Sequence, residues 1–498
     1  MNKVKIPFNP PNVRRIKMPK IIRPSFPNRT IDIRDYGAVG DGVTLNTGAF
    51  AKAIAACARA GGGRVLVPAG IWLSGPIHIK SNIELHIRKD AELRFSDRFS
   101  DYLPVVFTRW EGLECYNYSP LIYAKDCTNI AITGTGKLDG CGRKWWDWKA
   151  IQKPGAIKLY NMACKGVAVT KRVLGTEKDA LRPSFIEPVN CRNVLIEGIT
   201  IGSGPMWTVH PVYCDNVLIR KVNVNTRGVN NDGLVIDSTR NVLVEHCYFD
   251  TGDDCVVLKS GLNEDGWRVG RPTEKVVVRY CTTKQGHGGV TIGSEMSGDI
   301  RDIFVHNCEF NGTNNGIRVK SMRGRGGVVE NIWIQDIRMG RISRAAMTFN
   351  TFYGQSTLKP STKTPPVLRN IHVKNVACEY AGRAVKIIGL PEQPIENVTF
   401  VNVSIASRWG LECINVKDSK FLGVKITPIK EPVMLVKNSQ NITINKAACR
   451  EKIGIFLKIE GRKTKDIHLS GNNFSRAKKG IVLGKSVRPD SVGRHTRK

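Results

Sequence analysis

The sequence predicts an all-β protein whose chain winds into a parallel β-helix, a solenoid of stacked coils. A short phrase, one polar residue followed by alternating β-branched and apolar residues, recurs along the chain and is typical of a short strand. Its copies start at Asn193, Asn216, Asn241, Lys275, Asp302, Asn331, Asn370, Asn397, Asp418, Asn441 and Asp466. Most starts are 21–29 residues apart, a repetition that indicates coils unable to bury their apolar faces alone. Two longer spacings, 34 and 39 residues, indicate inserted loops.

The register of the repeat is a second observation in favour of this fold. The sixth residue after six consecutive starts is apolar: Ile199, Val222, Cys247, Cys281, Cys308 and Ile337. We expect these side chains to form one inward column, stacked at the strand spacing of about 4.8 Å. A leucine-rich repeat would show a fixed Leu-x-x-Leu-x-Leu lattice, which the chain lacks.

The segment 32–76 departs from the coil pattern and is expected to cap the solenoid. After the glycine-rich turn Tyr36–Gly42, a helical pattern places Phe50, Ile54 and Cys57 on one face. A solenoid needs a cap over the open end of its core, and an amphipathic helix provides one. The glycine spacing fits neither GxGxxG nor GxxxxGKS, so we assign this turn to structure.

The whole chain divides into an arm, a coil domain and a tail. Residues 1–28, rich in Pro, Lys and Arg, are expected to form an extended basic arm laid along the body. Residues 29–485 are expected to form the β-helix that carries the site, and residues 486–498 a basic tail. The arm lacks the apolar core of a signal peptide, and the many thiols favour a cytoplasmic location for the chain as written. If a leader has already been trimmed from this sequence, we expect a periplasmic or secreted protein instead.

The chain is strongly basic, with a formal net charge of +33. Such a charge indicates a polyanionic partner. No nucleic-acid-binding motif is present and the basic residues are spread over every coil, so we expect an acidic polysaccharide and no nucleic acid. No stretch of 18 apolar residues exists, so no membrane span is expected, and the oligomeric state stays open. The 14 cysteines lack CxxC pairs and are expected to be buried free thiols.

Polar motifs recur at similar distances from the starts of four consecutive coils. They are Asn231-Asp232-Gly233, Gly252-Asp253-Asp254, Gly286-His287-Gly288 and Arg318-Val319-Lys320. Because equal offset in a β-helix means the same face, we expect three carboxylates, one imidazole and two cations to form one stripe. Each motif alone fits a turn or a solvated strand, but four unrelated turns would not share one face of adjacent coils.

This stripe suits the hydrolysis of a glycosidic bond. One carboxylic acid must protonate the leaving oxygen, and a carboxylate must activate water or attack the sugar. Clustered carboxylates raise one another's pKa, which keeps one of them protonated near neutrality. Arg and Lys beside them would bind a sugar that carries a carboxylate, Arg through its bidentate fork.

In order and spacing, these four motifs resemble those of the polygalacturonases, family 28 of the glycoside hydrolases, and the resemblance covers nearly the whole chain. It implies a right-handed single-stranded parallel β-helix, an inverting mechanism, no metal and no other cofactor. It also implies polygalacturonate or an oligogalacturonide as substrate. Two departures are small: Asn231 stands where the family often has Thr, and Val319 replaces the common Ile. A tyrosine that the family places farther along has no clear match, with Tyr353 as a candidate.

The resemblance also implies the roles of the motif residues. Asp253 would be the general acid, Asp232 and Asp254 would hold the attacking water, and His287 would support the acid. Asn231 belongs to the same substrate-binding face, and Arg318 and Lys320 would bind the galacturonate carboxylate. For inversion, at least one acid–base pair is expected to be separated by roughly 6.5–9.5 Å.

Long segments near the motifs favour a blocked pocket and therefore attack on chain ends, as in the exo-acting branch of the family. They are 111–120, 145–176 with three tryptophans, and 261–272. The loop 322–327 adds Arg323 and Arg325, which are expected to grip a terminal galacturonate, and Trp207 and His210 are expected to line the same pocket. We therefore expect release of monogalacturonate, and less often digalacturonate, from the non-reducing end.

Two other functions stay open. A calcium-dependent lyase or epimerase on a uronate polymer shares the β-helix and the N-terminal segment. It would need acidic calcium ligands and a Lys or Arg base, and it leaves the Gly-His-Gly coil without a role. A non-catalytic polysaccharide-binding solenoid would keep the repeat but has no need of three carboxylates in register.

Overall fold

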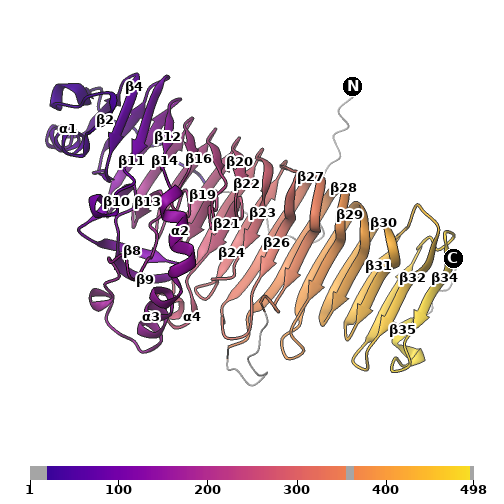
Figure 1. Cartoon of the computed structure of the whole chain (residues 1–498). Coiled ribbons are helices and arrows are strands. Elements are labelled where there is room, and N and C mark those ends of the chain that lie inside the picture. Colours follow the sequence, from indigo (N-terminus) through magenta and orange to yellow (C-terminus); the bar gives the residue numbers. More distant parts are fainter. Residues whose placement is uncertain (1–18, 355–363, 494–498) are drawn as a thin grey trace, which may run out of the picture.

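The chain forms a right-handed parallel β-helix in which almost every strand pairs in parallel with its equivalent one coil away (Figure 1). The computed structural model describes residues 19–354 and 364–493, so the expected arm and tail lie partly outside the described residues. The fold prediction is confirmed, including the cap: helix α1 (Thr47–Arg59) buries Phe50, Ile54 and Cys57 against the first coils. In the described ranges, no helix is both long and apolar enough to cross a bilayer.

The strands form three stacks along the axis. The first holds β1 (Thr30–Asp32), β3 (Gly63–Val67), β6 (Ile83–Ile87), β11 (Thr128–Gly134), β14 (Arg192–Glu197), β16 (Asp215–Arg220), β19 (Arg240–Glu245), β22 (Thr273–Arg279), β24 (Ile300–His306), β31 (Gln440–Asn445), β33 (Lys465–Ser470) and β35 (Val492–Gly493). The second holds β2 (Asp41–Leu45), β4 (Gly70–Ser74), β7 (Ala91–Phe95), β12 (Lys137–Asp139), β15 (Thr200–Gly202), β17 (Asn223–Thr226), β20 (Tyr248–Thr251) and β25 (Glu309–Phe310).

The third stack carries the polar motifs. It holds β5 (Ile77–His78), β10 (Ile122–Lys125), β13 (Ile186–Val189), β18 (Leu234–Asp237), β21 (Val256–Lys259), β26 (Thr313–Lys320), β32 (Ile453–Glu460) and β34 (Ala477–Leu483). Five long strands bend through two or three stacks: β23 (Thr282–Ile292), β27 (Val328–Asn350), β28 (Val367–Ile388), β29 (Ile395–Ile414) and β30 (Val416–Lys437).

The polar residue that opens each phrase is a corner of the coil. Asn193, Asn216 and Asn370 have φ values of 58°, 60° and 57°, a left-handed conformation that Asn tolerates better than most residues. These side chains also form a ladder, in which Asn370 Nδ2 donates to Asn331 Oδ1 at 3.2 Å and Asn397 Nδ2 donates to Asn370 Oδ1 at 2.9 Å. The repeated Asn of the sequence therefore stabilises the turn and links neighbouring coils.

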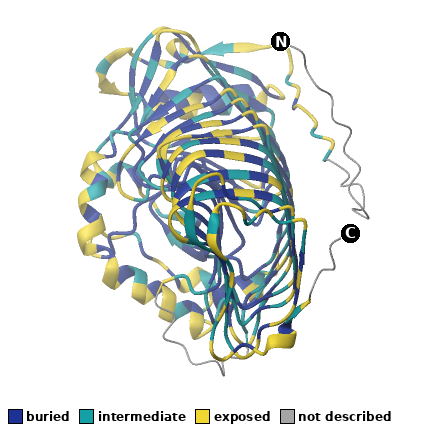
Figure 2. Ribbon diagram, turned by 90° about the vertical axis from the view of Figure 1, so that its right-hand side faces the viewer, coloured by how far each residue is buried: buried dark blue, intermediate teal, exposed yellow. Residues whose placement is uncertain are grey.

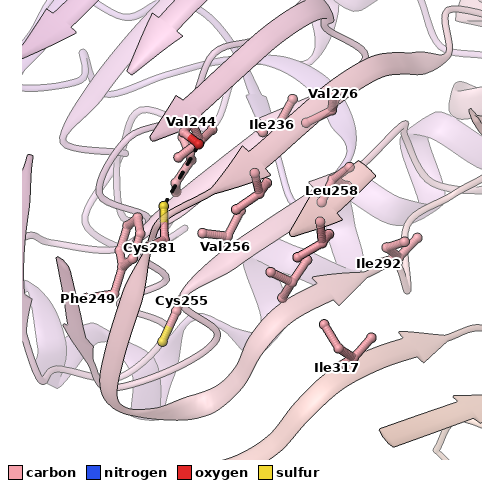
Figure 3. Close-up of a cluster of buried hydrophobic side chains, with 14 of the residues drawn as sticks. Ile236, Val244, Phe249, Cys255, Val256, Leu258, Val276, Cys281, Ile292 and Ile317 are labelled. Carbon is pink, nitrogen blue, oxygen red and sulfur yellow. Dashed lines mark hydrogen bonds between the residues drawn. The ribbon is translucent and has the colours of Figure 1, made fainter. Parts of the chain in front are cut away.

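The inward column holds the apolar residues expected from the register. All six side chains of the sixth position are buried, among them Cys247, Cys281 and Cys308. Figure 3 shows the neighbouring core, where the Cys281 thiol faces the carbonyl oxygen of Val244 at 3.9 Å. The 14 cysteines are free and 12 of them are buried, so they act as small apolar residues. Figure 2 shows buried positions repeating from coil to coil along the stack.

Two segments expected as loops are helical, which corrects the sequence-based interpretation. Segment 145–176 belongs mainly to α2 (Arg143–Ile151) and α3 (Lys153–Cys164), and segment 261–272 contains α4 (Asn263–Val269). Trp145 and Trp148, one helical turn apart, pack on each other, with ring centroids 4.8 Å apart, and on Phe99 and Tyr118. Two of the three tryptophans therefore hold α2 on the body instead of reaching into a pocket.

A hairpin covers the outer face of the N-terminal coils beside these helices. Its antiparallel strands are β8 (Val106–Trp110) and β9 (Leu113–Asn117). Arg109 Nη1 donates to Asp237 Oδ1 at 2.9 Å, an ion pair with both side chains fully buried. Arg172 Nη1 donates to Asp265 Oδ1 at 2.9 Å, and Asp265 Oδ2 accepts from the Glu114 amide at 2.8 Å. Among the described strands, β8 and β9 pair only with each other, so side chains fix the hairpin, which lies beside the coils in Figure 1.

The remaining short elements and the arm lie at the periphery. The 3-10 helices are η1 (Ile33–Tyr36), η2 (Phe99–Tyr102), η3 (Val169–Lys171) and η4 (Pro489–Ser491). The described part of the arm lies along the first stack, where the Ile22 amide donates to Asn216 Oδ1 at 2.8 Å. Asn216 Nδ2 in turn donates to the Ile22 carbonyl at 2.7 Å, so the arm is bound to the asparagine ladder.

The asparagine ladder leads to a stability prediction. We expect Asn370→Ala to lower the melting temperature more than Asn370→Gly. Both variants lose the ladder hydrogen bonds, but only alanine must also bear the left-handed backbone, a difference of about 1 kcal/mol. Calorimetry of the two variants and the wild type measures this difference. Equal melting temperatures for the two variants would show that the ladder, and not the backbone conformation, selects Asn at the corner.

Candidate active site

Strand pairing in the third stack brings the polar motifs together. Leu234 pairs with Val256, Val256 with Val290, and Val290 with Ile317. The residues two positions before these four are Asp232, Asp254, Gly288 and Asn315. Because the strands are in register, these positions form one column across four coils, with Asp253 and His287 in the column beside it.

The glycine in this column makes room for a carboxylate. A Cβ added at Gly288 would lie 2.8 Å from Asp254 Oδ1 and 2.3 Å from Thr291 Oγ1, closer than real Cβ atoms come. Any side chain at this position would displace Asp254. The Gly-His-Gly motif therefore serves the carboxylate of the preceding coil as well as presenting the imidazole.

Asp232, Asp253 and Asp254 each present an oxygen atom within 4.8 Å of the other two. The expected acid–base separation of roughly 6.5–9.5 Å is therefore wrong for the nearest oxygen atoms of these pairs. The physical reason is the fold: two of the carboxylates are adjacent in sequence, and the third lies one strand spacing, about 4.8 Å, away.

His287 and Asp253 form a hydrogen-bonded pair. His287 Nδ1 lies 2.9 Å from Asp253 Oδ1, so the imidazole donates to the carboxylate. Burial alone would raise the pKa of Asp253, but this hydrogen bond and the charges of His287 and Lys320 outweigh it and lower that pKa. The same hydrogen bond raises the pKa of His287. The surroundings of Asp253 therefore favour its ionised form.

Asp232 has the opposite shift. Burial raises its pKa well above the ordinary value, and the negative charge of Asp253 raises it further, against the opposing charge of Lys259. The opposite shifts mean that a proton shared between these two carboxylates favours Asp232 over Asp253.

Asp254 is held by cations. Lys320 Nζ donates to Asp254 Oδ2 at 2.9 Å, and Arg318 Nη1 lies 3.9 Å from Asp254 Oδ1. That Oδ1 is buried without a hydrogen-bond partner, so it is available to a bound water or substrate hydroxyl. The Tyr353 ring lies against both cations, with its centroid 5.2 Å from Arg318 Cζ and 5.1 Å from Lys320 Nζ. The structure thus places Tyr353 in the site.

These groups surround a cavity of about 580 Å³. Besides the motif residues, its lining includes Glu111, Trp207, Lys259, Glu295, Arg325, Arg344 and Tyr353. Two of the residues predicted to line the pocket, Trp207 and Arg325, are among these lining residues. Lys259 forms an ion pair with Glu295, and its Nζ lies 4.9 Å from the Trp207 ring centroid. Despite burial, Lys259 holds the pKa of Glu295 at about 2.

Three predicted binding residues do not reach the cavity. Asn231 is buried and its side chain donates to the carbonyls of Gly204 and Met206, both at 2.9 Å, so it fixes the turn before Asp232. His210 is 0% exposed and lies between Glu187 and Asp237, whose charges raise its pKa against the effect of burial. The His210 ring packs edge-on against that of Trp207, ring centroids 4.8 Å apart, and Trp207 lines the cavity.

Arg323 is the third of these residues. It forms an ion pair with Glu392 and lies over the Phe352 ring, 5.2 Å from its centroid. Its guanidinium therefore binds Glu392 and does not line the cavity that holds the three aspartates. Its neighbour Arg325 lines the cavity instead and donates to Asn263 Oδ1 of α4 at 2.9 Å.

Sequence reasoning missed Lys259, Glu295, Glu111 and Arg344. Lys259 ends the phrase Val256-Val-Leu-Lys259, and an outward charge at the end of a strand is ordinarily solvated. Here the Trp207 ring packs against it and Glu295 pairs with it. The one available signal was its register: Lys259 lies opposite Asp237 in the same outward column.

The three carboxylates have the composition of a cation site, but their surroundings fit proton transfer better. Asp254 already accepts from an ammonium, and a guanidinium lies 3.9 Å from its other oxygen. A calcium site needs six or more oxygen ligands free of such competing charges. The donor set is therefore that of a general acid–base site.

The comparisons with known proteins agree with this chemistry. Residues 57–421 match the family "Glycosyl hydrolases family 28". A probable polygalacturonase of Vitis vinifera is 32% identical over 383 residues, which cover 74% of this chain and 73% of that protein. An exo-poly-alpha-D-galacturonosidase of Dickeya chrysanthemi is 27% identical, over 79% of this chain and 70% of its own. The crystal structure of a hyperthermoactive exopolygalacturonase from Thermotoga maritima has 39% identity and a TM-score of 0.74, covering 80% of this chain and 93% of its own.

The opposed pKa shifts lead to a spectroscopic prediction. We expect Asp232 to carry a proton at a pH where an ordinary aspartate is ionised, because burial and the charge of Asp253 raise its pKa. Infrared difference spectra between wild type and Asp232→Asn isolate its protonated carbonyl band over a pH series. Asp253→Asn removes the neighbouring charge, so the band should vanish at a lower pH.

Asp250→Asn is the matched control, since Asp250 lies on the adjacent strand β20 and pairs with Arg227, away from the cavity lining. It should leave the band where it is in the wild type. A band that vanishes at the same pH with and without the Asp253 charge would contradict the shared proton.

Proposed function

The chain belongs to glycosyl hydrolases family 28, and on this premise we propose that it hydrolyses α-1,4 links of polygalacturonate, the acidic chain of pectin, from the non-reducing end and with inversion. The protein is thus a glycoside hydrolase, which decides against the lyase and the non-catalytic solenoid. The observation that carries the proposal is the column of Asp232 and Asp254, with Asp253 beside it, flanked by Arg318 and Lys320.

Each motif residue receives a role in this reaction. Asp253, at the surface of the cavity, protonates the leaving oxygen, and Asp232 and Asp254 hold the attacking water. The unpartnered Oδ1 of Asp254 supports this assignment, because it offers a free acceptor for that water. Arg318 and Lys320 bind the carboxylate of the sugar on the leaving side.

In the free site the pKa shifts favour a proton on Asp232, whereas the proposed reaction needs it on Asp253. Binding of an anionic sugar beside Lys320 and Arg318 offsets their positive charges and excludes water from Asp253. Both effects raise the pKa of Asp253. The substrate thus moves the shared proton to the acid and leaves Asp232 ionised as a base. Only the productive complex has both groups in their working states.

Attack at a chain end is supported by the closure of one side of the cavity. The hairpin tip, Glu111 and Gly112, lies against the segment before α4, where the Leu262 amide donates to the Gly112 carbonyl at 3.1 Å. A Cβ on Gly112 would lie 3.2 Å from Glu295 Cγ, so the tip also packs on a cavity wall. Arg325, bound to Asn263 of α4, completes this wall.

The wall also defines which chain end is bound. Arg318 and Lys320 lie on the side toward the C-terminal coils, and Glu111, Trp207 and Lys259 lie on the side toward the hairpin. If the cations hold the leaving sugar, the closed side holds the sugar whose anomeric carbon is attacked. That sugar has no predecessor, so it is the non-reducing end. The exo-acting names of two similar proteins support the same mode.

Cleavage mode is tested by the products. We expect monogalacturonate, with less digalacturonate, as the first product from polygalacturonate, and a viscosity that falls slowly relative to the release of reducing ends. Chromatography of early time points, beside viscometry of the same samples, measures both. A rapid loss of viscosity with a ladder of mid-sized oligomers would show that the cavity is open at both ends.

Stereochemistry is tested separately. Family membership supports inversion, whereas a short carboxylate separation is typical of retention. We expect inversion, because Asp232 and Asp254 together hold the attacking water. This water then does not have to fit into a gap between the acid and a single base. Proton NMR of the first product should show the β-anomer before mutarotation. Initial α-anomer would mean that one of the carboxylates attacks the sugar directly.

A further inference from the structure

A second cationic cavity continues from the active-site cavity across the C-terminal coils. It has a volume of about 230 Å³ and shares Arg318, Lys320, Arg344 and Tyr353 with the first. It adds Arg383 and Lys386, which belong to no recognised motif. Because the lining is shared, the two cavities form one continuous surface that leads away from the closed wall.

Strand register places these cations in line with the active site. Arg318 pairs with Thr348, and Thr348 pairs with Lys386, so Lys386 lies two strands beyond Arg318, roughly 10 Å along the axis. Arg383 pairs with Trp409 of β29, which extends the row by another strand. The row therefore runs parallel to the axis on the same stack as the catalytic residues.

The charges along this row are mostly uncompensated. Arg383 Nη1 lies 3.6 Å from Glu412 Oε2, the one carboxylate that pairs with this row among the described residues. Among the described residues, no carboxylate oxygen lies within 4.0 Å of the Arg344 or Lys386 cation, so three cations face one carboxylate. Trp409, which is 40% exposed, lies beside them with Arg383 Cζ 5.8 Å from its ring centroid. An exposed indole next to unpaired cations suits a sugar ring that carries a carboxylate.

We propose that Arg344, Arg383, Lys386 and Trp409 bind the galacturonosyl residues that follow the cleaved link, so that the polymer lies along the C-terminal coils. The inference rests on the proposed function and deepens it. One end of the polymer is held at the wall, and the row accounts for where the rest of the chain lies. Affinity then depends on chain length, and the carboxylates of the polymer supply the anions that the row lacks.

The test compares substrates of increasing length. Arg383→Ala/Lys386→Ala should keep wild-type kcat/KM on digalacturonate, which spans only the cleaved link. On polygalacturonate, kcat/KM should fall by at least about tenfold, or about 1.4 kcal/mol. Added salt should lower the wild-type rate on the polymer more than that of the variant, because the variant has fewer charges to screen.

A matched double variant, Arg338→Ala/Lys425→Ala, is the control. Both residues are exposed and lie in one register column, through Ala377 and Ser404, on a different stack from the row. This control should behave as the wild type on every substrate. Equal losses on digalacturonate and polygalacturonate, or no loss on either, would overturn the proposal.

Binding separates this proposal from the proposed function. Calorimetric titration of oligogalacturonates into Asp253→Asn measures affinity without turnover. Affinity should rise with oligomer length until the row is filled, and the rise should be lost when Arg383→Ala/Lys386→Ala is added. Absence of hydrolysis by the wild type, with this length dependence intact, would refute the hydrolase assignment and leave the row standing. Affinity independent of length would refute the row.

Discussion

Parallel hydrogen bonding between successive coils is the constraint on which the site depends. It fixes a spacing of about 4.8 Å between equivalent residues. Asp232 and Asp254, one coil apart, therefore each present an oxygen atom within 4.8 Å of the other. The same spacing excludes a side chain at Gly288 and sets the distance at which Lys320 reaches Asp254. The geometry of catalysis is therefore a property of the repeat, and the loops only decide what can enter.

Charge balance in the site follows from that geometry. Three carboxylates in so small a space would repel one another strongly in the absence of cations, and Lys259, Lys320, Arg318 and His287 surround them. The cations do not act equally: His287 and Lys320 favour the charged form of Asp253, whereas burial of Asp232 favours its neutral form. An anionic substrate enters this balance as a further participant. In the proposed reaction, recognition of the substrate's charge and placement of the catalytic proton are then a single event.

The coils and their motifs were accessible from the sequence because they repeat locally. Each Asn marks a left-handed corner, and the residues between corners alternate with the pleat, so register could be counted without a structure. The repeat does not show which outward side chains are covered by other segments of the chain. His210 and Lys259 occupy outward positions that would be solvated on a bare β-helix, but both are buried and Trp207 packs against both. The helices within 143–164 were not predicted for a similar reason. They depend on tertiary packing of Trp145 and Trp148, and this packing leaves no repeating pattern in the sequence.

The hairpin β8–β9, which is proposed to decide the cleavage mode, is attached to the coils without being part of their strand pairing. The buried pairs Arg109–Asp237 and Arg172–Asp265 hold it on the outside of the coils, and no strand of the β-helix pairs with β8 within the described residues. A chain without this hairpin would keep the strand pairing that forms the carboxylate column. The same coils can therefore carry either a closed or an open cavity, because the segment that closes it is attached to the scaffold without being part of it.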